Sequence, residues 1–161
     1  MNECVVNDLA TLIDQEHAIV TELLTVLEQE SHALMHNDIR AIESTAQSKK
    51  QLLDRFQTQV QHRLDFLSTR QMEPSEQGFK DFLHTLVEQS NHPIHEQWGN
   101  LRQDFAELIK KNEENGIVIH HSQHRARSLL NILHGKENQP NLYNESGAAK
   151  GQGQRHRLGE A

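Results

Sequence analysis

The sequence predicts an all-α protein: an antiparallel bundle of three long coiled-coil helices with one short helix and a disordered C-terminal tail. Residues that favour helices recur along its 161 positions, whereas glycine (8) and proline (3) are scarce. Aromatic residues make up only 4% of the chain, fewer than a β-sandwich or a doubly wound sheet needs. Apolar residues also recur at alternating spacings of three and four in three long stretches, which is typical of coiled-coil helices.

The first long helix is predicted over residues 5–35. Two glutamates, Glu16 and Glu30, interrupt its apolar seam, and we expect such charges to reach solvent or to meet a basic residue across the helix pair. The seam consists of Leu9, Ile13, Glu16, Val20, Leu23, Leu27, Glu30 and Leu34.

The second long helix follows a connection of only three residues, and Asn37 or Asp38 is expected to cap its first turn. A connection this short between two long helices predicts an antiparallel hairpin. The predicted seam consists of Ile39, Ile42, Ala46, Lys49, Leu53, Phe56, Val60, Arg63 and Leu67.

A short helix over residues 79–89 and a third long seam complete the predicted bundle, with the short helix packed near one end. Turn signals fill residues 68–78, and Pro93 favours a helix boundary. Gly135 can close the last helix as a C-terminal cap. The third seam consists of Trp98, Leu101, Phe105, Leu108, Asn112, Asn115, Ile119, Ser122, Ala126, Leu129 and Leu133.

Two regions are therefore predicted: a helical bundle over residues 1–135 and a flexible tail over residues 136–161. The tail is polar and carries four glycines, so it cannot bury enough apolar surface to offset the entropy of ordering. We expect it to stay disordered until a partner binds.

Composition argues against several function classes. The formal net charge of −7 disfavours a nucleic-acid-binding surface, and the single cysteine, Cys4, excludes an intrachain disulfide. No stretch approaches the ~20 apolar residues of a membrane span, and the acidic start does not resemble a signal peptide. We therefore expect a cytoplasmic protein.

Histidine-rich and nucleophilic motifs give no support for an enzyme. His120, His121 and His124 form an HHxxH pattern, which lacks the glutamate of the HExxH metalloprotease motif. No serine lies in a GxSxG turn, and no glycine-rich loop follows a strand. We expect no catalytic residues, no cofactor and no metal.

Surplus apolar residues near the end of the third long helix form a candidate partner-binding surface. Leu129, Leu130, Ile132 and Leu133 cover roughly 160° of the helix at ~100° per residue, more than one core stripe requires. Packing against the short helix or against a second protomer is an equally good explanation.

Asn112, Asn115 and Gly116 weaken the third helix where its seam should be apolar. We expect the two asparagines to form buried polar layers that fix the register, at a cost in stability. Replacing Asn115 with leucine is therefore expected to raise thermal stability. Gly116 would allow close helix approach or a local bend.

Several segments, taken in order, resemble the FlgN-type flagellar export chaperones. The long opening helix with its Asp-containing corner and the stretch KKQLLDRF (49–56) are similar to that family. NEENGIVI (112–119) resembles its Asn-x-x-Asn-Gly-apolar motif, and LYNESG (142–147) resembles the tyrosine-glycine element of its tail. The resemblance covers residues 5–147.

The resemblance implies a non-enzymatic chaperone of flagellar type III secretion. Such a protein binds hook-associated proteins, which form the hook–filament junction, prevents their premature assembly and delivers them to the export apparatus. Leu142 and Tyr143 in the tail would join the helical surface in partner binding. A generic coiled-coil scaffold without export cargo is the alternative, and the oligomeric state, monomer or homodimer, is left open.

Overall fold

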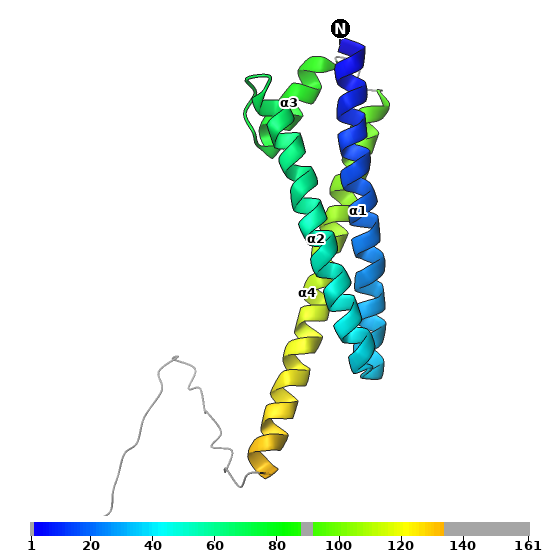
Figure 1. The fold of residues 1–161 in the computed structure, drawn as a ribbon, viewed down its shortest axis with the longest axis vertical. Helices are drawn as coiled ribbons and strands as arrows, with labels where there is room; N and C mark the ends of the chain where they lie inside the picture. Colours follow the sequence, from blue (N-terminus) through cyan, green and yellow to red (C-terminus); the bar gives the residue numbers. More distant parts are fainter. Residues whose placement is uncertain (1, 88–91, 134–161) are drawn as a thin grey trace, which may run out of the picture. The chain divides into compact units, whose positions relative to one another are not determined.

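Four helices make up the computed structural model, which describes residues 2–87 and 92–133 (Figure 1). They are α1 (Asn2–His36), α2 (Ile39–Ser68), α3 (Glu76–Leu86) and α4 (Pro93–Leu133), and these ranges contain no strand. The predicted fold class of three long helices and one short helix is confirmed. The chain divides into two units, residues 1–121 and 122–161, and residues 122–133 are the described part of the second. Gly135 and the predicted tail, residues 136–161, lie outside the described residues.

Polar contacts define how the helices of the first unit run. Along α1, Glu16 pairs with Arg63 and Glu30 with Lys49, so α2 runs antiparallel to α1 (Figure 1). Contacts between α1 and α4 instead advance together along both helices, from the pair of His17 with Asp104 to that of Glu28 with Lys111. The α4 segment of this unit is therefore parallel to α1 and antiparallel to α2.

The corner between α1 and α2 is closed by backbone geometry and one side chain. Asn37 adopts the left-handed conformation (φ 52°), and the next amide, of Asp38, donates to the carbonyl of Ala33 at 3.0 Å, as in a Schellman cap. The Asp38 carboxylate then accepts from the Ala41 amide at 3.1 Å. The prediction that Asn37 or Asp38 caps the second helix is confirmed, with Asp38 in that role.

Two helices begin before the first apolar residue of their predicted seams. Helix α3 begins at Glu76 instead of residue 79, since Ser75 accepts a hydrogen bond from the Gly78 amide at 3.0 Å. A Cβ on Gly78 would collide with the carbonyl oxygen of Glu73, so this turn requires glycine. Helix α4 begins at Pro93, where a missing amide proton costs nothing in a first turn.

In the core of the first unit, the buried residues of α1 include those of its predicted seam, whereas the prediction for α2 is wrong at several positions. Every α1 seam residue is buried except Leu34, which is half-buried. On α2, however, Ile39, Ala46 and Leu53 are exposed, and the buried positions are Thr45, Leu52, Arg63 and Leu67. Leucines at 52 and 53 satisfy the apolar pattern equally well, and only packing against α1 selects Leu52.

Helix α3 covers one end of this core. The Phe79 ring is fully buried and lies 4.5 Å from the ring of Trp98 on α4, measured between centroids. Ile94, in the first turn of α4, is also buried, although the predicted seam began only at Trp98. A fully buried apolar side chain of this size contributes about 1.5–3 kcal/mol, so α3 is an integral part of the folded unit.

Candidate functional site

The first polar layer of the core joins Glu16 of α1 to Arg63 of α2. Arg63 Nε donates to Glu16 Oε1 at 2.7 Å, and both side chains are more than nine-tenths buried. The guanidinium also lies 5.0 Å from the ring centroid of Phe79 and 5.1 Å from that of Trp98. Burial raises the pKa of Glu16, and the hydrogen bond and positive charge of Arg63 oppose that rise only in part.

The second polar layer joins all three long helices. Lys49 Nζ of α2 donates to both carboxylate oxygens of Glu30 of α1, at 2.7 and 3.0 Å. Asn115 Nδ2 of α4 donates to Glu30 Oε2 at 3.0 Å and to the carbonyl of Leu27 at 2.9 Å. The expectation that seam glutamates meet basic residues across the helix pair is therefore confirmed for both layers.

The three residues predicted to set the register occupy unequal environments. Asn115 is buried, whereas Asn112 is exposed and makes one long contact, 3.5 Å, with Lys49. The prediction of two successive buried asparagine layers is therefore wrong for Asn112. A Cβ on Gly116 would meet no atom of another element within 4 Å, so close helix approach does not explain this glycine.

The apolar residues predicted to bind a partner lie on the last two turns of α4, in the second unit. Leu129, Ile132 and Leu133 are 62%, 63% and 80% exposed, and Leu130 is exposed as well. The same turns carry Arg127 and no acidic residue. We name Leu129, Leu130, Ile132 and Leu133 the terminal apolar face. Leu142 and Tyr143, the predicted tail contacts, lie outside the described residues.

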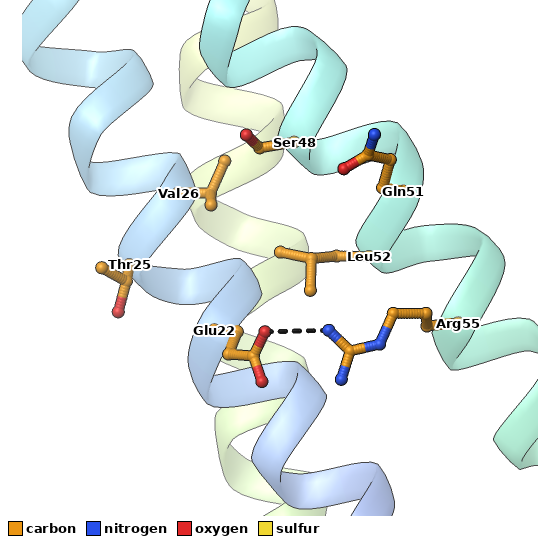
Figure 2. A pocket seen from close by; sticks show the side chains of 7 residues that line it. All are labelled: Glu22, Thr25, Val26, Ser48, Gln51, Leu52 and Arg55. Atoms are coloured by element: carbon orange, nitrogen blue, oxygen red, sulfur yellow. Dashed lines mark hydrogen bonds and ion pairs between the residues drawn. The ribbon is translucent and has the colours of Figure 1, made fainter.

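A hollow between α1 and α2 is lined by Glu22, Thr25, Val26, Ser48, Gln51, Leu52 and Arg55. It measures about 430 Å³, and the ion pair of Arg55 with Glu22, 3.1 Å long, crosses it, below Leu52 in the view of Figure 2. Both charged side chains are half exposed, so the pair is screened by solvent and contributes little. Neither a histidine nor a cysteine lines this hollow.

Metal sites and membrane spans are also absent from the part of the chain that the structure describes. No group of three or more His, Cys, Asp or Glu side chains there could hold a metal ion. None of the described helices combines the length and apolarity needed to cross a membrane.

The chain is similar to one family of known proteins. The model of one protein family, described as FlgN protein, matches residues 1–151 of this chain. No curated protein and no solved structure matches the chain significantly. The family match spans both polar layers, the terminal apolar face and most of the tail. The chain therefore belongs to the FlgN family, whose members are flagellar export chaperones.

Proposed function

We propose that this protein is a cytoplasmic chaperone of the hook-associated proteins, which it keeps from assembling early and delivers to the flagellar export apparatus. The single observation that carries this proposal is the terminal apolar face, which stays exposed in a chain of the FlgN family. An apolar helix face can bind the apolar stripe of a partner helix along several turns.

The physical setting of the face supports cargo binding. Three of its side chains are more than three-fifths exposed, and contiguous exposed apolar area usually marks an interaction site. The tail, residues 136–161, would add Leu142 and Tyr143 to the contact. A segment that orders only on binding lowers the net affinity, which would ease release of the cargo at the export apparatus.

The test is a calorimetric titration of purified hook-associated proteins into the wild type and into a double variant, Leu129→Ala with Leu133→Ala. A leucine side chain that becomes fully buried in a complex contributes about 1.5–3 kcal/mol to the binding free energy. Truncating two of them should therefore weaken binding by about tenfold or more. The free energy of unfolding should change by less than about 0.5 kcal/mol, because both side chains are exposed in the free protein.

A matched control removes similar area elsewhere. Met35 and Ile39 are each 69% exposed near the corner between α1 and α2, and the double variant Met35→Ala with Ile39→Ala should bind cargo like the wild type. A truncation after Gly135 separates the contribution of the tail. If the wild type binds no hook-associated protein at micromolar concentration, the proposal fails and the plain coiled-coil scaffold becomes the better explanation.

A further inference from the structure

Asn115 and Gly116 form the one asparagine–glycine pair of the sequence. Such a pair is chemically unstable, because glycine has no Cβ to hinder the approach of its amide nitrogen to the side chain before it. Packing does not require the glycine, since a Cβ at Gly116 would meet no atom of another element within 4 Å. The pair therefore places a reactive asparagine in α4 where a larger residue would fit.

The folded second polar layer protects Asn115 from this reaction. Its side chain is only 5% exposed, and Nδ2 donates to the Leu27 carbonyl and the Glu30 carboxylate. Within an α-helix each backbone amide donates to the carbonyl four residues earlier, so the Gly116 nitrogen is held away from the Asn115 side chain. Deamidation of Asn115 therefore requires this turn of α4 to unwind first.

Helix α4 is least secured by packing after Asn115. Asn115 is its last buried residue, since none of the described residues 116–133 is buried. The next six residues, GIVIHH (116–121), are a glycine, three β-branched residues and two histidines, which all form helices less readily than alanine or leucine. A helical stretch without tertiary packing is only marginally stable in water. The easiest opening of α4 therefore runs from its C-terminal end back to Gly116.

We propose that Asn115 is a deamidation site, which becomes reactive when α4 unwinds back to Gly116. In the unwound turn the Gly116 nitrogen attacks Asn115 Cγ and forms a succinimide ring. The Cγ–Nδ2 bond breaks, and ammonia leaves with the proton that the Gly116 nitrogen loses. Water then adds to one carbonyl of the ring and opens it, which gives aspartate or isoaspartate at position 115. Water is the only co-reactant.

The product cannot rebuild the second polar layer. A carboxylate at position 115 has no proton to donate to the Leu27 carbonyl, and it would face the Glu30 carboxylate across the 3.0 Å that the amide now bridges. Lys49 would then have to neutralise two carboxylates. Deamidation would therefore make the opening permanent, at the turn from which α4 continues toward the terminal apolar face. This inference does not depend on the proposed function, and its test uses no cargo.

Peptide mapping by mass spectrometry measures the reaction in the full-length protein, folded in mildly alkaline buffer and unfolded in guanidinium chloride. The ratio of the unfolded to the folded rate is the protection of Asn115, which tracks the population of the open form when opening is fast. We expect this protection to be at least about tenfold smaller than the equilibrium constant of global unfolding, because opening one end of a helix costs less than unfolding the chain. A protection as large as that constant would overturn the inference.

Asn112 supplies an internal control, because it lies on the same helix, is exposed and precedes glutamate. It should stay unmodified while Asn115 reacts, and modification of both at equal rates would contradict the role of the glycine. Gly116→Ala should slow the reaction at Asn115 by about tenfold or more, since the added Cβ hinders the attack and favours the helix.

A second pair of variants tests whether the opening starts at the end of α4. Ile117→Ala with Val118→Ala, at positions 59% and 42% exposed, should slow deamidation about fivefold, because alanine is the better helix former at both. Ile39→Ala, at a position 69% exposed on α2, should leave the rate unchanged. Each rate is divided by that of the same variant in guanidinium chloride. A rate that ignores the α4 substitutions, or responds equally to the α2 substitution, would overturn the inference.

Asn115→Asp reproduces one product and tests its effect on the layer. Hydrogen exchange of the backbone amides of residues 112–116 should quicken about tenfold or more, because a hydrogen bond to a charged group is lost. The amides of α3 should keep their protection. Unchanged exchange at residues 112–116 would refute the claim that deamidation loosens α4.

Discussion

Replacing Asn115 with leucine tests the polar layer that joins the three long helices. In the folded protein the Asn115 amide nitrogen donates to the buried Glu30 carboxylate at 3.0 Å and to the Leu27 carbonyl at 2.9 Å. Leucine has nearly the same shape, so the substitution replaces a donor with a methyl group and leaves the backbone in place. It would put that methyl group at about 3 Å from two oxygen atoms.

The expected change is a loss of stability of about 1–2 kcal/mol. A hydrogen bond to a charged group contributes about 1.5–3 kcal/mol and one to a backbone carbonyl about 0.5–1.5 kcal/mol. Burying the leucine methyl groups offsets part of this loss, since a fully buried leucine contributes about 1.5–3 kcal/mol. Glu30 keeps Lys49 as its partner, so it is not left as an unpaired charge. The melting temperature should fall by about 2–8 °C.

Thermal and urea unfolding followed by circular dichroism measure this change, and sedimentation measures the oligomeric state. The control is Asn112→Leu on the same helix, which should alter stability by less than about 0.5 kcal/mol because that side chain is exposed. An Asn115→Leu variant as stable as the wild type would refute the reasoning. A variant more stable than the wild type would restore the expectation from the sequence, that replacing Asn115 with leucine raises thermal stability.

Three further predictions concern the same unit. Arg63→Met should lower the free energy of unfolding by about 3–5 kcal/mol in urea, because it leaves Glu16 buried without a counter-ion. The control, Arg55→Met at the exposed ion pair, should change it by less than about 1 kcal/mol. Equal effects of the two substitutions would contradict this prediction. Burial raises the pKa of Glu16, so the folded state holds the carboxyl proton more tightly than the unfolded chain does. The protonated carboxyl therefore stabilises the fold fully below the ordinary glutamate pKa. This stabilisation is lost as the pH rises through the folded-state pKa of Glu16. Melting temperatures of the wild type and of Glu16→Gln are measured as the pH rises through the folded-state pKa of Glu16. Only the wild type should lose stability over these pH values. Parallel profiles of the two proteins would contradict the prediction. Gly78→Ala should destabilise the protein, because a Cβ at this position collides with the preceding loop. Gly116→Ala should instead stabilise it by about 0.5–1 kcal/mol in thermal melts, because nothing lies near the added Cβ. A destabilised Gly116→Ala variant would contradict this prediction.

The seam of α1 shows how far sequence pattern alone can go. Apolar residues also flank this seam, as at Leu24 and Val26, yet every predicted seam residue except Leu34 is buried. On α2 two leucines stand side by side, and the pattern could not tell that Leu52 is buried and Leu53 exposed.

The candidate sites show a similar division. The terminal apolar face could be predicted because four apolar residues exceed what one core stripe needs, and all four are exposed. The proposed deamidation site could be predicted only in part, because the Asn115–Gly116 pair is visible in the sequence but its place at the last buried residue of α4 is not. That place depends on where α4 packs against α1.

By itself the sequence determined the helical class, the three long helices and their short partner, a cap at Asn37 or Asp38 and the resemblance to the family. These depend on local spacing, and a local pattern is fully present in the chain. Only the tertiary structure decided which seam charges meet, because Glu16 and Arg63 lie 47 positions apart, and Asn115 reaches Glu30 across 85. It also separated the two asparagines, since helix packing buries Asn115 and leaves Asn112 in solvent. Pairing across helices depends on how they align in space, and no periodicity within one helix contains that information.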